Sequence, residues 1–455
     1  MKKILKSIAF STLFLAGVNA QTNPAIFSWL QNNIITGSHY VQGNSTPIAD
    51  AVLVNVQTVQ YSTNWVYAST KGIPSYVTGP FLDGNPSFAS DQNAIYKISL
   101  NPVQNTGTAA ATTPGNIGIF INGVSLFDYR DGVAWNPNTN ALCGGPGNPP
   151  CPGGPQANQD WNRDAIPAEK AGFDCAKGHP AMGNYHHHQN PSAFNLDLAV
   201  ISNICDLYLA DGLYVIDSTV HSPLIGFAYD GFPIYGAYGY KNLNGTGGIT
   251  RMKSGYSQRN ITVRNTSPTG ASVSSGPNVS TTYPIGYFRE DNEFIANASP
   301  DYLDVHNGRV CVTPEYPNGT YAYFATVDED WNSTYPYVVG PTFYGTVTGS
   351  KVTSVSEPTT TYASTAGIVE VLKENDFTVY PNPASDLLMI QIKTKVEENM
   401  LVKLYDIKGK MVAEKQFLQG RTIVFFETEV LYDGIYFLEI NNGKSTVRKQ
   451  VAIQH

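Results

Sequence analysis

Residues 116–127 have the sequence NIGIFINGVSLF, and this stretch decides the fold class. Asn122 and Gly123 stand near its middle, between two short apolar runs. An asparagine-glycine pair favours the two-residue turn that joins antiparallel strands, because both positions tolerate a positive φ. A second run at 94–100, AIYKISL, has the apolar alternation of a half-buried strand. We therefore predict a hairpin at 116–127 and a further strand at 94–100.

The composition points to the same class over most of the chain. Glycine (41) and proline (29) are plentiful, aromatic residues reach 12% and charged residues only 14%, which favours strands and turns over long helices. From about residue 23 to residue 349, short apolar runs alternate with turn residues. Because 455 residues exceed the roughly 250–300 at which one core stops growing, we expect several domains. The predicted fold is mainly β, with one large β-rich domain at 21–349.

The first twenty residues have the pattern of a secretion signal. Lys2, Lys3 and Lys6 precede an apolar run at 8–18, and the small residue Ala20 suits a signal peptidase. We expect a cleavable signal peptide at 1–20. No later stretch reaches about 18 apolar residues, so we expect no transmembrane segment after signal removal.

The last part of the chain differs in character from the large domain. Residues 350–372 are rich in Ser, Thr and Val and are predicted to be a linker. Beyond them, residues 373–455 are predicted to form a small immunoglobulin-like β-sandwich, with hairpin turns at Lys408-Gly409 and Asn442-Gly443. The strand candidates are 377–380, 387–392, 401–407, 422–426, 435–440 and 446–453.

Charge and cysteine usage limit the function classes. The net charge of −8 and the absence of a Lys/Arg-rich stretch argue against a nucleic-acid partner, since phosphate binding needs clustered cations. An exported chain can form disulfides. Cys143 and Cys151 bracket a Gly/Pro-rich loop and are the predicted pair among five cysteines, the others being Cys175, Cys205 and Cys311. The odd cysteine is either a free core residue or a ligand.

Histidines provide the strongest chemical signal. Three are consecutive at 186–188, and in a strand His186 and His188 would share one face while His187 faces the other way. His179 can approach from the adjoining loop to complete a metal site. Imidazole suits zinc, copper, iron or nickel. The alternative is that these rings only pack against the sheet, each bonded to backbone or water.

Further candidate site residues lie closer to the C-terminal end of the large domain. His221 is a candidate metal ligand or general base, or else a cap for the turn that follows it; His306 is a further candidate ligand. Asp230, Asp304 and Arg309 are candidate catalytic residues, able to orient an imidazole or hold an anionic substrate. The alternatives are that Asp230 stabilises a tight turn and that the other two belong to a charged loop.

Three segments of the large domain resemble the YHYH protein family. They are GHPAMGNYHHHQNP at 178–191, HSPLIGFAYDGFPIYGAYGY at 221–240 and LDVHNGRVCVTPEYPNGTYAYFAT at 303–326. The resemblance spans at least residues 116–347, so residues 21–349 are assigned as the YHYH domain. His187 stands where the family pattern has its second tyrosine, which leaves His186 and His188 in place. The resemblance names the domain and implies no reaction.

The tail resembles the type IX secretion (Por secretion) sorting domain. The resemblance rests on YPNPA at 380–384, LYDIKGK at 404–410 and GIYFLEI at 434–440. It implies recognition by the type IX secretion machinery and a secreted or cell-surface protein that passes through the periplasm and outer membrane. The alternative is an ordinary immunoglobulin-like adhesion module.

Three functional hypotheses follow. The first is an exported YHYH protein that binds a divalent metal ion, with zinc or copper suspected; if it is an enzyme, it would be a metal-dependent hydrolase or oxidase. The second is a non-enzymatic protein that binds polysaccharide or another surface polymer, for which the 28 tyrosines would supply stacking rings. The third is a structural surface protein in which the histidines only pack.

Overall fold

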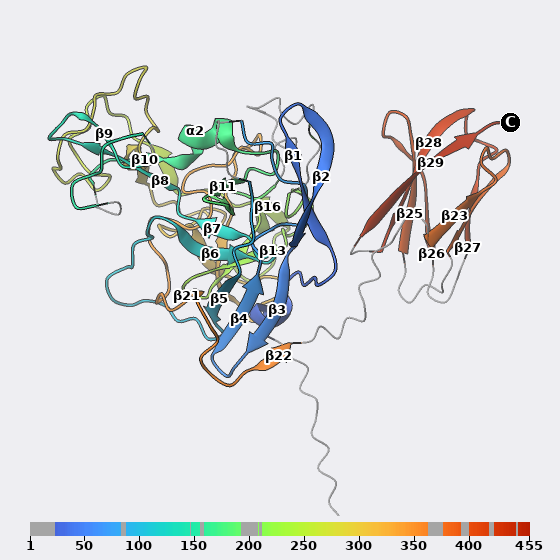
Figure 1. Cartoon of the computed structure of the whole chain (residues 1–455), viewed down its shortest axis with the longest axis horizontal. Coiled ribbons are helices and arrows are strands. Elements are labelled where there is room, and N and C mark those ends of the chain that lie inside the picture. Colours follow the sequence, from blue (N-terminus) through green and yellow to red (C-terminus); the bar gives the residue numbers. More distant parts are fainter. Residues whose placement is uncertain are drawn as a thin grey trace, which may run out of the picture. The chain divides into compact units, whose positions relative to one another are not determined.

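The computed structural model divides the chain into two compact units, Met1–Ala363 and Ser364–His455, and each is described by itself (Figure 1). The described residues are 23–82, 88–145, 147–154, 159–192, 208, 212–362, 376–392, 400–417, 423–442 and 445–455. The predicted signal peptide at 1–20 and Cys205 lie outside these residues. The structure is mainly β, as the sequence predicts.

An eight-stranded sheet forms the centre of the first unit. Its spatial order is β11-β12-β7-β6-β13-β14-β20-β19, and neighbours are antiparallel except for β12 with β7 and β14 with β20. The strands are β6 (Asn116–Phe120), β7 (Ser125–Phe127), β11 (His179–Ala181), β12 (Asn184–His187), β13 (Leu224–Ala228), β14 (Pro233–Tyr235), β19 (Gly308–Cys311) and β20 (Thr320–Phe324). The sheet therefore joins segments that are almost 200 residues apart in sequence.

The hairpin predicted at 116–127 is confirmed as β6 and β7. Its turn uses Asn122, whose side chain accepts a hydrogen bond from the Val124 amide at 3.2 Å, and Gly123, whose φ is +80°. A Cβ at Gly123 would lie only 2.2 Å from the Thr70 hydroxyl oxygen, so both conformation and space require glycine. The strand predicted at 94–100 is confirmed as β5 (Ala94–Ser99).

A five-stranded antiparallel sheet shares the core of the first unit. Its order is β21-β5-β4-β3-β22, with β3 (Val56–Tyr61), β4 (Trp65–Thr70), β21 (Ser350–Val352) and β22 (Thr360–Tyr362) around β5. Its two edge strands fall within residues 350–372, which the sequence assigned to a linker. Threonine and valine suit an edge strand as well as a tether, so composition alone did not separate the two.

The remaining elements of the first unit are short. A three-stranded sheet has the order β10-β8-β9, and β1 with β2, β15 with β16 and β17 with β18 form two-stranded sheets. The bounds are β1 (Thr36–Val41), β2 (Asn44–Leu53), β8 (Arg130–Asn136), β9 (Ala141–Cys143), β10 (Asn162–Asp164), β15 (Tyr238–Tyr240), β16 (Ile249–Arg251), β17 (Tyr256–Gln258) and β18 (Asn292–Phe294). The helices are α1 (Pro24–Phe27), α2 (Ala165–Glu169), η1 (Lys170–Gly172) and η4 (Arg289–Asp291). No described helix is long and apolar enough to cross a membrane.

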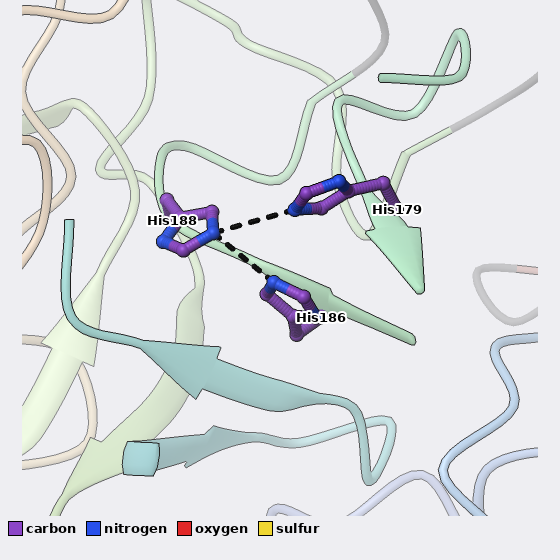
Figure 2. A group of neighbouring side chains, drawn as sticks. All are labelled: His179, His186 and His188. Atoms are coloured by element: carbon purple, nitrogen blue, oxygen red, sulfur yellow. Dashed lines mark hydrogen bonds between the residues drawn. The ribbon is translucent and has the colours of Figure 1, made fainter. Parts of the chain in front are cut away.

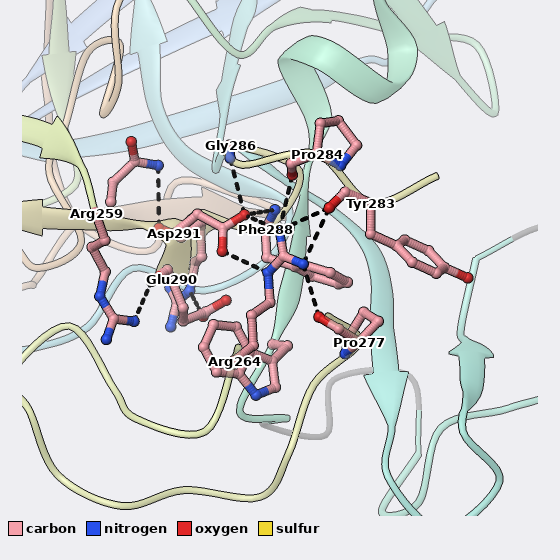
Figure 3. A network of polar contacts seen from close by, with 12 residues as sticks. Arg259, Arg264, Pro277, Tyr283, Pro284, Gly286, Phe288, Glu290 and Asp291 are labelled. Carbon is pink, nitrogen blue, oxygen red and sulfur yellow. Dashed lines mark hydrogen bonds and ion pairs between the residues drawn. The ribbon is translucent and has the colours of Figure 1, made fainter. Parts of the chain in front are cut away.

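A buried arginine organises the irregular segment between β17 and β18 (Figure 3). Arg264 is fully buried and makes a bidentate ion pair with Asp291, with both N···O distances at 2.7 Å. Its other N–H groups donate to the backbone carbonyls of Pro277, Tyr283 and Pro284. The guanidinium thus satisfies carbonyls that a segment without regular strands would otherwise leave unpaired.

Cysteine pairing agrees with the sequence prediction. Cys143 and Cys151 form a disulfide that closes the Gly/Pro-rich loop. Cys175 is also disulfide-bonded, so it is not the odd cysteine. Cys311 is the free cysteine of the described residues, and it is buried in the core.

The second unit is a β-sandwich. One sheet has the order β23-β24-β27 and the other β26-β25-β28-β29, and a common apolar core takes residues from both. The strands are β23 (Phe377–Tyr380), β24 (Leu387–Ile392), β25 (Met400–Asp406), β26 (Met411–Phe417), β27 (Ile423–Glu427), β28 (Gly434–Asn441) and β29 (Thr446–Ile453). All six predicted strands are present, and the sequence prediction missed β26.

We expect Arg264→Met to lower the free energy of unfolding of the first unit by about 3–5 kcal/mol, because it leaves the Asp291 carboxylate buried and unpaired. Lys71→Met is the matched control. It breaks a 2.8 Å ion pair with Asp91 at the surface and should cost about 0–1 kcal/mol. Urea denaturation of both variants measures the two costs, and equal costs would contradict the role given to Arg264.

Candidate metal centre

A tight hairpin places the first two histidines side by side. Strands β11 and β12 pair so that His179 lies directly opposite His186. The connecting residues Met182 and Gly183 have φ values of +49° and +82°, the backbone of a two-residue hairpin turn. Directly opposed residues of an antiparallel pair project from the same face of the sheet. The sequence predicts His179 on a loop, whereas the structure places it on strand β11.

His188 completes a cluster of three imidazoles (Figure 2). Its Nε2 lies 3.0 Å from Nε2 of His186 and 3.4 Å from Nε2 of His179. One ligand atom from each residue lies within 4.8 Å of the other two. All three residues are buried, with exposures of 6% for His179, 2% for His186 and 4% for His188. A metal ion needs several histidine, cysteine or acidic side chains close together. Among the described residues, these three histidines are the cluster of that kind.

Backbone carbonyls set the orientation of two of the rings. Nδ1 of His188 lies 2.6 Å from the carbonyl oxygen of Asp128, and Nδ1 of His186 lies 2.8 Å from that of Asn184. A carbonyl oxygen only accepts, so each Nδ1 carries the hydrogen and a neutral ring presents a bare lone pair at Nε2. Such second-sphere bonds are the usual way in which proteins orient metal-binding histidines.

The separations between the Nε2 atoms match those of a metal shell. Tetrahedral zinc–nitrogen bonds of about 2.0–2.1 Å place neighbouring nitrogens roughly 3.3–3.4 Å apart. The observed 3.0 and 3.4 Å lie close to this value. Two bare lone pairs at such distances repel one another unless a proton or a metal ion lies between them.

Burial and neighbouring charges determine the protonation of the metal-free cluster. Burial lowers the pKa of His186 well below its usual range, and positive charge on His179 and His188 would lower it further. Burial also disfavours the charged form of His188, but the Glu169 carboxylate outweighs burial and raises the pKa of His188. In the metal-free cluster, His188 is therefore protonated more readily than His186. A metal ion would compete with that proton for the Nε2 lone pair of His188.

Aromatic side chains form two walls of the cluster. The ring of Phe127 stacks on His186 with centroids 3.8 Å apart, and Phe173 meets His179 edge-on at 4.9 Å. These contacts fix the planes of the imidazoles and limit the access of water. Rigid support of this kind would keep ligand atoms in place for a metal ion.

His187 points to the opposite face, as the strand alternation predicts. Its Nε2 accepts a hydrogen bond from the Tyr76 hydroxyl at 2.7 Å, and its Nδ1 donates to the Lys177 carbonyl at 3.1 Å. Burial lowers the pKa of His187 to about 3. His187 is therefore a neutral packing residue at the position where the family pattern has tyrosine.

Glu169 is a site residue that the sequence analysis missed. Its Oε2 lies 3.2 Å from Nε2 of His179 and 3.2 Å from Nε2 of His188. Glu169 is the last residue of helix α2, ten residues before His179, the first histidine of the cluster. Burial would raise the pKa of Glu169, but the nearby imidazoles of His179 and His188 outweigh burial and lower it. No local motif marks this glutamate, so only the tertiary structure could have found it.

The structure does not bring His221 and His306 to the cluster. His221 Nδ1 donates to the Ser222 carbonyl at 2.7 Å, and His306 Nδ1 lies 2.7 Å from the Thr342 hydroxyl. For His306, strand order explains the separation: β11 and β12 lie at one edge of the eight-stranded sheet, whereas β19, which follows His306, lies at the other. Each step between strands is about 4.8 Å. The expectation that these two histidines join the same ligand set is therefore not retained.

The three candidate catalytic residues have structural contacts instead. Asp230 accepts hydrogen bonds from the Tyr323 hydroxyl at 2.6 Å and from the Gly345 amide at 2.8 Å. Asp304 accepts from the Tyr321 hydroxyl at 2.9 Å and caps its own turn. Arg309 donates to three backbone carbonyls, those of Tyr240, Lys241 and Pro300. The Phe232 amide also donates to Asp230, at 3.3 Å, which supports the turn interpretation of Asp230. None of the three residues belongs to the histidine cluster.

Tyrosines of the central sheet are core residues rather than a stacking surface. Tyr235 and Tyr323 on β14 and β20 have exposures of 0%, and Tyr321 has 3%. A polysaccharide could not stack on these rings without unfolding the sheet. The described contacts therefore give the polymer-binding hypothesis no support from this group of tyrosines.

The pH dependence of stability should report the buried carboxyl of Asp230. Burial raises the pKa of Asp230 to about 6, against about 3.9 for an unfolded aspartate. The protonated Asp230 carboxyl therefore adds roughly 3 kcal/mol to the free energy of unfolding at low pH. This contribution is fully present below about pH 4 and is lost as the pH rises through about 6. We expect the difference in unfolding free energy between wild type and Asp230→Asn to fall by that amount from pH 4 to pH 7. A difference that does not change with pH would contradict the assignment.

Comparisons with known proteins agree with both resemblances. A model of the YHYH protein family matches residues 95–337, and a model of the secretion system C-terminal sorting domain matches residues 378–454. No curated protein matches the chain. A solved DUF3244 family protein from Bacteroides vulgatus, with an immunoglobulin-like β-sandwich fold, is 18% identical with a TM-score of 0.16. That similarity covers 17% of this chain and 85% of the other.

The two family matches settle export and family membership. A type IX sorting domain is recognised by the type IX secretion machinery, so the protein passes through the periplasm and outer membrane and is secreted or held at the cell surface. The match at residues 95–337 covers more than half of the 455-residue chain and includes all three clustered histidines. The chain belongs to the YHYH protein family and carries a C-terminal secretion sorting domain.

Proposed function

We propose that this exported protein binds one divalent transition-metal ion through the Nε2 atoms of His179, His186 and His188. The observation that carries the proposal is the convergence of three buried nitrogens, two of which have Nδ1 committed to a backbone carbonyl. Their lone pairs face one another at metal-shell distances. Packing alone would not require three imidazoles to meet at their acceptor nitrogens.

The donor set favours zinc, with copper as the alternative. Three imidazoles beside a carboxylate offer nitrogen and oxygen donors, which suit zinc and Cu(II), whereas soft sulfur ligands select Cu(I). The separations of 3.0 and 3.4 Å between Nε2 atoms fit tetrahedral bonds to zinc.

Metal identity would decide any reaction. Three protein nitrogens leave room for a further ligand, and zinc in such a shell lowers the pKa of bound water to about 7. Zinc would thus support hydrolysis, and copper would support oxidation. The family match names no reaction, so the proposed function is metal binding, with catalysis as a consequence to be tested once the metal is known.

Elemental analysis of the purified exported protein tests the proposal. We expect about one zinc or copper ion per chain in wild type and loss of that metal in His186→Ala/His188→Ala, because the variant keeps one imidazole of three. The matched control is His39→Ala/His455→Ala, which removes two histidines outside the cluster and should keep the metal. Absence of metal from wild type, even after reloading with zinc and copper, would refute the proposal.

Removal of the metal should destabilise the first unit selectively. A ligand present at 100 times its Kd stabilises the folded state by about 2.7 kcal/mol, so chelation should lower the Tm of the first unit by several degrees. The sorting domain has its own core and serves as an internal control. Differential scanning calorimetry with and without chelator measures both transitions. An unchanged first transition would count against a metal bound in the folded core.

A further inference from the structure

We infer that Glu169 is the fourth donor to the metal ion and that it is an exchangeable one, through whose position a small anionic ligand reaches the metal. This inference rests on the proposed function, because it assumes that the three histidines hold a metal. The inference goes beyond metal binding in two respects. It names Glu169 as the position at which a ligand enters, and it names small anions as the class of ligand.

The position of the Glu169 oxygen supports a role as a donor. Oε2 lies 3.2 Å from Nε2 of both His179 and His188, close to the separation of neighbouring ligands around tetrahedral zinc. The oxygen atom is buried, yet it has no hydrogen bond of acceptable geometry. A buried carboxylate oxygen without such a bond is costly unless a cation neutralises it. A metal ion between this oxygen and the nitrogens would satisfy all of them together.

The local fold holds helix α2 where Glu169 can reach the cluster. Asp164 caps the helix, with its side chain accepting from the Ile166 amide at 2.9 Å and from the Tyr337 hydroxyl at 2.8 Å. The Ala165 amide donates to the Tyr129 carbonyl at 2.7 Å. The residue before Tyr129 is Asp128, whose own carbonyl orients His188. The same short segment therefore positions both the carboxylate and one of the imidazoles.

Exposure distinguishes Glu169 from the histidines. Its side chain is 25% exposed, against 8% for His179 and 3% for His188. Phe127 and Phe173 pack against the rings of His186 and His179. An incoming ligand would therefore approach along the Glu169 side chain. In the exchange, the metal–Oε2 bond breaks and a bond to the incoming anion forms, so one negative donor replaces another and no oxidation or reduction takes place.

Cobalt(II) provides a direct readout of the fourth donor, because its visible absorption reports the coordination number and ligand type. The experiment compares the full chain, Glu169→Ala and the matched control Glu293→Gln, each loaded with cobalt(II) and titrated with azide and with acetate. We expect Glu169→Ala to bind cobalt at least tenfold more weakly than wild type, with a changed spectrum, and Glu293→Gln to match wild type.

Anion binding completes the test. Azide should perturb the wild-type spectrum by displacing Glu169, and at least tenfold less azide should suffice for Glu169→Ala. Acetate should restore a wild-type-like spectrum to Glu169→Ala by replacing the missing carboxylate. If Glu169→Ala has wild-type affinity and spectrum, Glu169 is not a donor, although the histidine site stands. If azide never perturbs the wild-type spectrum, the fourth position is closed. If no protein binds cobalt or zinc, the proposed function itself fails.

Discussion

The antiparallel pairing of β11 with β12 is the constraint on which the histidine site depends. Its register sets His179 opposite His186, and the next residue on the same face is His188. A slip of one residue would exchange the faces and present His187 in place of the other two. The short turn at Met182-Gly183 fixes this register, because a two-residue loop permits only one pairing of the flanking strands.

Tyrosine hydroxyl groups allow this β-rich interior to contain carboxylates. Asp164, Asp174 and Asp230 are each buried and accept a hydrogen bond from a tyrosine on another segment. Burial raises their pKa values to about 7, 7 and 6 respectively. Because a buried polar group without a partner is costly, each pair ties its two segments together. Asp164 with Tyr337 and Asp230 with Tyr323 join distant segments, whereas Asp174 and Tyr185 are 11 residues apart. Asp164 extends this network to the helix that carries Glu169.

The chain combines a histidine-bearing domain with an address for export. The sorting domain keeps its own apolar core, so it can fold as a separate unit. The three clustered histidines all belong to the first unit. Export also permits the disulfide between Cys143 and Cys151, which the cytosol would disfavour. The proposed metal site contains imidazole and carboxylate groups but no thiolate, and neither of these groups forms a disulfide under the oxidising conditions outside the cell.

Local patterns in the sequence were sufficient to predict the mainly β class, the Asn122-Gly123 hairpin, six strands of the sandwich and the opposite orientation of His187, because turn chemistry and the period of two act over a few residues. They could not predict the rest. The sequence alone could neither connect Glu169 to the cluster nor exclude His306, because both depend on which strands become neighbours in the sheet. It likewise could not show that Asp230 accepts a hydrogen bond from Tyr323, which lies 93 residues away in sequence. Strand order is a property of the whole packed core, and only the tertiary structure decided it.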